Sequence, residues 1–107
     1  MTDITRLCRG QPCYIRLEGI CGDPETVVPA HLRMPGISGL GIKAPPIFVC
    51  PACMHCHDAV DRRRFTDLDR DYVLKAHYEG IFRWQNELYD REIITAAVIR
   101  GSARRES

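Results

Sequence analysis

One short segment of the chain carries side chains that bind two different kinds of metal ion. Cys53 and Cys56 are separated by two residues, and His57 and Asp61 follow closely. Two cysteines at this spacing bring both thiolates to one zinc ion, whereas an imidazole and a carboxylate can hold a second, more open metal site. Arginines occupy positions 62–64, and guanidinium groups bind phosphate oxygens. The segment therefore predicts a structural zinc site beside a site for phosphodiester chemistry, as in a small zinc-stapled nuclease.

A zinc ion held by thiolates needs four ligands, so this cysteine pair requires a second pair. Cys13 and Cys21 are the natural suppliers, because the residues between them are compatible with a hairpin that brings both sulfurs together. Cys50 could replace Cys53 as a ligand, and Cys8 has no assigned partner. We interpret Cys50 and Cys8 as free thiols. The alternative interpretation is that the cysteines are simply buried apolar side chains.

The composition indicates a single soluble globular domain spanning residues 1–107. Hydrophobic residues make up 45% of the chain and charged residues 27%, and no apolar run approaches the roughly 18 residues of a membrane-spanning helix. The chain opens without a signal peptide, so we expect a cytoplasmic protein. In a reducing compartment six cysteines favour metal binding or free thiols over disulfides. The net charge of +1 permits a nucleic-acid-binding face without demanding one.

The segments that must position these side chains change character halfway along the chain. Residues 3–9 are predicted to form a short helical turn, and residues 14–17 and 27–32 form short β-prone segments around a Gly/Pro-containing turn. Residues 34–46 are rich in glycine and proline and are predicted to form a long loop. A helix is expected from near Cys56 through the arginines to about Phe65. The fold class is therefore α+β.

A longer helix is predicted in the C-terminal half. Asp67 or Asp69 can cap its start, because a carboxylate accepts hydrogen bonds from the exposed amides of a first turn. Residues at helical spacing form one face: Val73, Ala76, His77, Gly80, Ile81, Trp84 and Leu88. This face is expected to pack on the strands and the metal loop. Residues 93–99 fit a strand and a helix end equally well, and residues 101–107 are expected to fray.

Several of these motifs, taken in order, resemble the YbcO-like family of phage and prophage proteins, which are classed as nucleases. This family is similar to the RecA-dependent phage nuclease Ref and, more distantly, to HNH endonucleases. The resemblance runs from about Arg9 to Arg64. It is carried by Ala30-His31-Leu32-Arg33, by the Gly/Pro-rich loop with Lys43, by Cys13 and Cys21, and by Cys53-x2-Cys56-His57-Asp58-x2-Asp61-Arg62-Arg63.

The resemblance implies an HNH-type ββα-metal core. His31 stands where these enzymes carry the general base at the end of the first strand. His57 stands where a helical histidine binds the catalytic divalent ion, Mg²⁺ or Mn²⁺. Asp61 lies one helical turn after His57, so both side chains face the same way and share the ion, with Asp58 as the alternative ligand.

The resemblance also implies DNA as the partner, either single-stranded or a recombination intermediate, with RecA as a second partner in the bacterial host cell. Arg33, Lys43, Arg62 and Arg63 are then the residues that hold neighbouring phosphates. Two features depart from the HNH pattern: Ala30 replaces an acidic metal ligand, and residues 42–49 contain no asparagine. Two other hypotheses therefore stand beside the endonuclease, namely a zinc-stapled nucleic-acid-binding module without hydrolysis and a zinc-organised protein adaptor.

Overall fold

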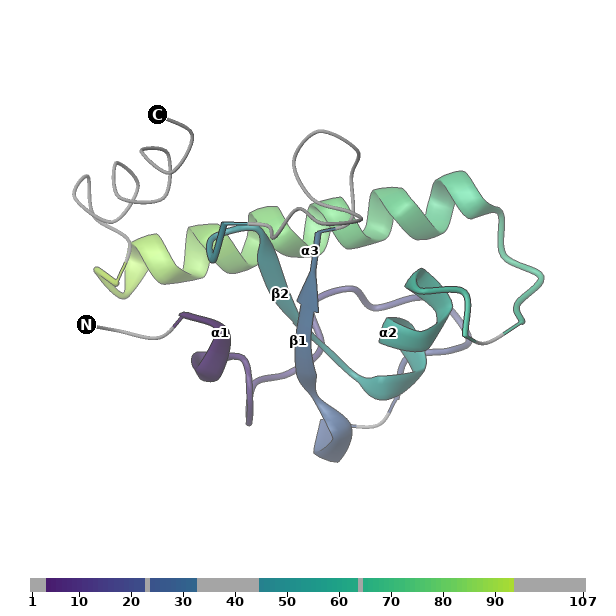
Figure 1. The fold of residues 1–107 in the computed structure, drawn as a ribbon, viewed down its shortest axis with the longest axis horizontal. Helices are drawn as coiled ribbons and strands as arrows, with labels where there is room; N and C mark the ends of the chain where they lie inside the picture. Colours follow the sequence, from purple (N-terminus) through teal and green to yellow (C-terminus); the bar gives the residue numbers. More distant parts are fainter. Residues whose placement is uncertain (1–3, 23, 33–44, 64, 94–107) are drawn as a thin grey trace.

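The computed structural model describes residues 4–22, 24–32, 45–63 and 65–93. A two-stranded sheet and a long C-terminal helix dominate this small α+β fold (Figure 1), as predicted. The elements follow in the order α1 (Ile4–Leu7), the 3-10 helix η1 (Pro24–Thr26), β1 (Val28–His31), β2 (Val49–Ala52), α2 (Met54–Val60) and α3 (Arg70–Asp90).

Strands β1 and β2 pair in antiparallel register, with Ala30 opposite Cys50 and His31 opposite Val49. The pairing extends one step further, because the amide of Leu32 donates to the carbonyl of Phe48 at 2.9 Å. All four residues of β2 are buried. The segment 27–32 thus contains the predicted strand, whereas β2 lies in a stretch where no strand was predicted.

The predicted strand at residues 14–17 is wrong. Arg16 has a φ of 58°, which places it in the left-handed region, and the segment forms bends instead of a ladder. Tyr14, Ile15 and Leu17 are all buried, so the chain here does not alternate between an inner and an outer face. The segment lies against the edge of β2, where the amide of Tyr14 donates to the carbonyl of Pro51 at 2.8 Å.

Helix α2 starts earlier and ends earlier than predicted. Its N-cap is Cys53, and the helix stops at Val60, before the arginines. The end is a Schellman motif: the amide of Arg63 donates to the carbonyl of Asp58 at 2.8 Å, and Arg62 has a φ of 60°. This left-handed residue turns the chain away, so the helix does not reach Phe65.

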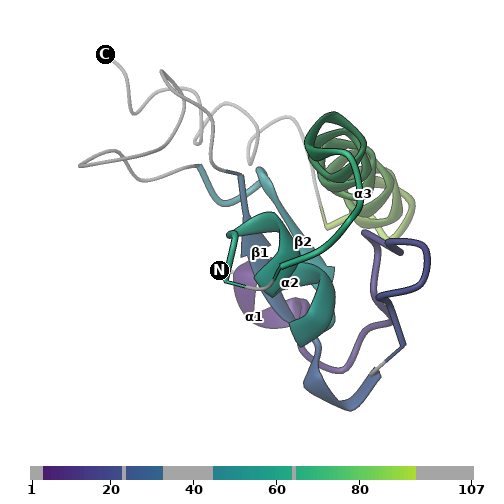
Figure 2. The same cartoon turned by 90° about the vertical axis from the view of Figure 1, so that its right-hand side faces the viewer.

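Helix α3 carries the face that the sequence predicted. Asp69 is the N-cap and accepts from the amide of Asp71 at 3.2 Å, which decides between the two predicted caps. All seven residues of the predicted face are buried. The helix runs across the strands (Figure 1), contacts β2 and α2, and lies to one side of the sheet when the molecule is turned (Figure 2).

Gly80 lets α3 approach the N-terminal segment closely. A Cβ atom at this position would lie 2.9 Å from the carbonyl oxygen of Tyr14 and 3.2 Å from the sulfur of Cys50. The Tyr14 carbonyl also accepts from the Arg83 guanidinium at 2.9 Å, and the rings of Tyr14 and Trp84 meet edge to face. These contacts tie the N-terminal segment, β2 and α3 into one core.

Some predictions fall on other parts of the chain. Residues 34–44 of the predicted loop, residues 94–99 of the apolar stretch and the tail at 101–107 lie outside the described residues. The same holds for Arg33 and Lys43. In the described ranges, no helix combines the length and the apolar character that a membrane crossing requires.

Candidate metal centre and basic pocket

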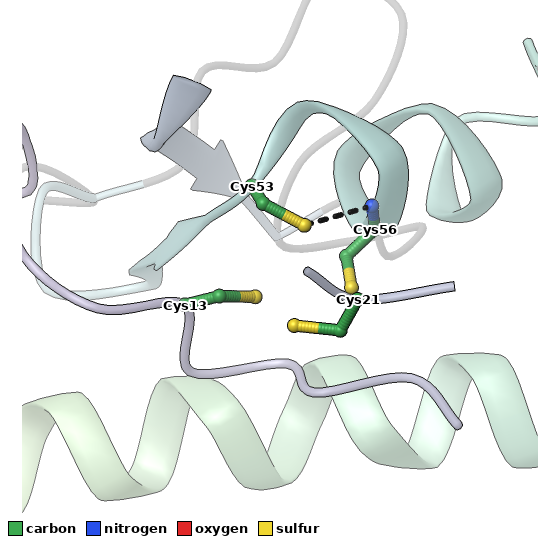
Figure 3. A group of neighbouring side chains, drawn as sticks. All are labelled: Cys13, Cys21, Cys53 and Cys56. Carbon is green, nitrogen blue, oxygen red and sulfur yellow. Dashed lines mark hydrogen bonds between the residues drawn. The ribbon is translucent and has the colours of Figure 1, made fainter. Parts of the chain in front are cut away.

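The four cysteines that the sequence singled out come together in space. Cys13 and Cys21 approach from the N-terminal segment, whereas Cys53 caps α2 and Cys56 lies in its first turn (Figure 3). Their sulfur atoms all lie within 4.8 Å of one another. Zinc bound tetrahedrally at about 2.3 Å from each sulfur requires sulfurs roughly 3.8 Å apart. A small contraction of this cysteine group therefore creates a four-thiolate site, and the group fits a metal such as zinc.

Backbone amides point at two of these sulfurs. The amide of Cys56 donates to the sulfur of Cys53 at 3.5 Å, and the amide of Leu17 donates to the sulfur of Cys56 at 3.5 Å. Both bonds favour the thiolate form that binds metal. The first turn of α2 thus supplies the two-residue knuckle, and the N-terminal segment closes over it.

The thiols of the cysteine group influence one another's protonation. A hydrogen bond from the Cys56 thiol lowers the pKa of Cys13 to about 4, and the same bond raises the pKa of Cys56. Burial raises the pKa of Cys21 to about 12. A metal binds the thiolate form of cysteine and displaces the thiol protons, so metal affinity at this group falls as the pH falls.

The other two cysteines stand apart from this group. Cys50 lies in the middle of β2 with its sulfur toward Gly80, and burial raises its pKa. Cys8 is also buried, and its thiol lies 3.8 Å from the carbonyl of Ile4. Neither forms a disulfide. The geometry therefore favours Cys53 over Cys50 as the fourth member of the group.

His57 of α2 and Asp61, the C-cap of this helix, face each other, as their spacing predicted. The Nε2 atom of His57 lies 3.4 Å from Oδ2 of Asp61, whose side chain is only 7% exposed. The guanidinium of Arg63 lies 3.9 Å from the same carboxylate oxygen. Asp58 is half-buried one turn earlier, and its carbonyl accepts the Arg63 amide. The structure thus pairs His57 with Asp61.

A pocket of about 260 Å³ opens beside Asp61, between the end of α2 and the start of α3. We call it the basic pocket, and it is lined by Val60, Asp61, Arg62, Arg63, Arg70, Leu74 and His77. Three guanidinium groups and one carboxylate give it a net positive lining. Arg62 and Arg63 were predicted to bind phosphate, and both line this pocket.

Two polar residues of the lining, Arg70 and His77, were not predicted as functional. Arg70 donates to the carbonyls of Ala59 at 3.1 Å and Val60 at 2.7 Å, and so closes the C-terminal end of α2. His77 was assigned to the face of the long helix with no chemical role. The sequence did contain a signal that could have identified His77, because it is the one titratable residue on an otherwise apolar helix face.

His31, the predicted base, is the last residue of β1 and is half-buried. It is not among the residues that line the basic pocket. The residue before it, Ala30, is buried, and its carbonyl oxygen lies 3.1 Å from Nε2 of His77.

Comparisons with known proteins first place the fold in a class. It is similar to a solved structure described as "a putative bacteriophage protein from Escherichia coli str. K-12 substr. MG1655", with a TM-score of 0.67 and 35% sequence identity. The match covers 82% of this chain and 98% of the other. The fold is therefore that of a small phage-type α+β protein.

The sequence places the chain in one family of this class. Residues 2–93 match the family model described as "Putative nuclease YbcO", and the chain belongs to this family. Curated relatives named "Putative nuclease YbcO" from Escherichia coli (strain K12) and "Putative nuclease ybcO" from Enterobacteria phage 82 are each 41% identical over 86 residues. Each match covers 79% of this chain and 88% of the relative. The family suggested by the sequence motifs is confirmed.

Proposed function

We propose that this chain is a metal-dependent DNA endonuclease of the HNH, or ββα-metal, type. The observation that carries the proposal is the His57–Asp61 pair, 3.4 Å apart, of which Asp61 lines the basic pocket. Its support is the order of elements, because an antiparallel pair of strands leads directly into the helix that bears the pair. Membership of a family named for a nuclease also supports a nucleic-acid substrate.

The His57–Asp61 pair suits a small divalent cation. Neighbouring ligands of an octahedral ion at about 2.1 Å lie roughly 3.0 Å apart, which is close to the separation of these two atoms. A bound Mg²⁺ or Mn²⁺ would stabilise negative charge on the phosphate and on the leaving oxygen. The Arg63 guanidinium lies near the same carboxylate and helps to hold Asp61 in place.

His31 acts as the general base in this proposal. A neutral imidazole can accept a proton from water. The water oxygen then attacks phosphorus, and the bond from phosphorus to the leaving oxygen breaks. Arg62 and Arg63 hold the flanking phosphates, with Arg33 and Lys43 as further phosphate contacts.

Zinc in the cysteine group has a structural role in this account. All four thiols converge there, which leaves no open coordination position for a substrate. Zinc binding would also constrain the neighbouring metal pair, because Cys56 is followed directly by His57. Fixing the sulfur of Cys56 therefore fixes the start of α2 and the backbone from which the His57 side chain departs.

A zinc-stapled nucleic-acid-binding module without hydrolysis is the second candidate. The observation in its favour is Ala30, which stands directly before His31 and provides no oxygen ligand. The divalent ion then has only His57 and Asp61 as proposed protein ligands. Two ligands bind an ion weakly, so this hypothesis predicts DNA binding that depends on salt but not on Mg²⁺.

Cleavage assays on supercoiled plasmid and on single-stranded DNA separate the two candidates. We expect zinc-loaded protein to cut with Mg²⁺ or Mn²⁺, to stop with EDTA, and to lose activity in His31→Ala with its zinc content intact. His55→Ala is the matched control, because His55 lies on α2 outside the pair. Parallel reactions with RecA filaments test the second partner. Binding without cutting under every condition would overturn the endonuclease in favour of the binding module.

A further inference from the structure

His77 is a buried polar side chain in the part of the core that the structure describes. Only 1% of its surface is exposed, and the other buried residues of the same helix face are apolar. Burying an imidazole is unfavourable unless its nitrogen atoms are hydrogen-bonded, and an apolar side chain of similar size would pack here without that penalty. The position therefore points to a role for the ring beyond filling space.

The ring bonds to the strand that bears the proposed base. Nε2 of His77 lies 3.1 Å from the carbonyl oxygen of Ala30, 47 positions away in sequence. A carbonyl can only accept, so Nε2 carries the proton in this contact. Ala30 precedes His31 directly, and the Ala30 carbonyl belongs to the peptide group that joins the two residues. Helix α3 thus holds the peptide from which the His31 side chain departs.

The same ring also reaches the other half of the proposed site. His77 lines the basic pocket together with Asp61 and Arg63, which come from the end of α2. Strand β1 and the end of α2 are not consecutive in sequence, because β2 lies between them. His77 therefore stands where the strand with the base and the helix with the metal pair must keep a fixed separation.

We propose that His77 is a positioning residue: its Nε2–H holds the Ala30–His31 peptide so that His31 is kept in register with the Asp61 side of the pocket. This inference rests on the proposed endonuclease function. Its ring touches neither the reacting phosphate nor the metal in this account. Losing the bond frees the peptide to rotate, and a displacement of the base by about 1 Å can lower a rate by roughly 100-fold.

The test compares variants that keep or remove the donor. His77→Gln retains an amide N–H near the position of Nε2, whereas His77→Leu fills the space without a donor. We expect His77→Leu to lower kcat by roughly 10- to 100-fold with unchanged DNA affinity and zinc content. His77→Gln should restore most of the rate. His77→Met repeats the apolar test with a side chain that adapts to the available space.

Leu88→Ala is the control for a general loss of stability. Leu88 is fully buried near the far end of α3 and does not line the pocket, so this variant should lower Tm and leave kcat unchanged. A wild-type kcat in folded His77→Leu and His77→Met would overturn the positioning role. A failure of His77→Gln to recover activity would overturn it as well.

A spectroscopic measurement separates this inference from the proposed function. The chain has four histidines, and comparison with His31→Ala identifies the His31 ring signals in ¹H–¹⁵N spectra, so His31 can be followed without any cleavage. We expect the His31 signals to shift in His77→Leu and to return in His77→Gln. If wild-type protein never cuts DNA, the nuclease fails while this result still decides the His77 contact. His31 signals that are identical in all three proteins would refute it.

Discussion

Arg62 occupies a backbone conformation that glycine adopts more easily. It has a φ of 60° at the end of α2, where the amides of Arg62 and Arg63 donate to the carbonyls of Ala59 and Asp58. Glycine is the usual residue at this position of a Schellman motif. This chain has an arginine at the position, and the arginine lines the basic pocket. We therefore predict that Arg62→Gly raises stability and weakens DNA binding.

The gain in stability and the loss of DNA affinity can each be given a magnitude. The left-handed conformation costs an L-residue about 1–2 kcal/mol, and the greater freedom of glycine in the unfolded chain offsets about 0.5–1 kcal/mol of this. A net gain of about 0.5–1 kcal/mol corresponds to roughly 2–6 °C in Tm. Losing one phosphate contact makes the dependence of log affinity on log salt concentration shallower by about 0.9. At roughly 0.1 M salt this corresponds to a loss of close to 8-fold in DNA affinity.

Thermal unfolding and fluorescence anisotropy on labelled DNA at several salt concentrations measure both effects. Glu92→Gly is a close control, because Glu92 has a φ of 59° in the same motif at the end of α3 and does not line the pocket. It should gain similar stability and keep its DNA affinity. An Arg62→Gly protein that binds DNA like wild type, with an unchanged salt slope, would refute the role of Arg62.

Three further predictions concern the cysteines and the helix contact. Cys53→Ala should lose bound zinc and several kcal/mol of stability, whereas Cys50→Ala should keep its zinc. A colorimetric zinc assay and thermal melts measure both effects. Equal zinc loss in the two variants would contradict the assignment of Cys53, and not Cys50, to the cysteine group. Burial raises the pKa of the Cys50 thiol above its unfolded value of 9.0. The stability that the buried, protonated thiol contributes is therefore fully present below pH 9. Above pH 9 it is lost by about 1.4 kcal/mol per pH unit. Urea unfolding from pH 8 to 11 should therefore show a shallower loss in Cys50→Ala than in wild type, and parallel curves would count against a buried thiol. Gly80→Ala should destabilise the protein by about 1–3 kcal/mol, because the new Cβ meets the carbonyl of Tyr14. Gly22→Ala is the control and should change stability little, because the space around Gly22 is open. A Gly80→Ala protein as stable as wild type would show that α3 shifts freely.

The parts of the fold that the sequence predicted are those with a local signal. The buried face of α3 repeats at helical spacing and was readable without tertiary information, whereas the sequence offered both Asp67 and Asp69 as its cap. Strand β2 gave no such signal. After Val49 it contains Pro51 and Ala52, which are uncommon in strands, and it is buried throughout, so it lacks the alternation that marks a half-exposed strand.

The same distinction applies to the candidate site. The spacing of Cys53 and Cys56, and the single helical turn between His57 and Asp61, place these pairs within one helix and its cap. The pocket is different, because α3 supplies part of its wall. The role of His77 in it depends on how α3 crosses the sheet, and that packing decides the contact with Ala30.

The endonuclease account depends most directly on a divalent ion at His57 and Asp61. The measurement that tests it is the rate of plasmid nicking by zinc-loaded protein as a function of Mn²⁺ concentration, for wild type, Asp61→Asn and Asp58→Asn. We predict a rate that saturates with Mn²⁺ in wild type and in Asp58→Asn, and that is nearly absent in Asp61→Asn with zinc content unchanged. Nicking by Asp61→Asn at the wild-type rate, or no nicking by wild type at any Mn²⁺ concentration, would contradict the account.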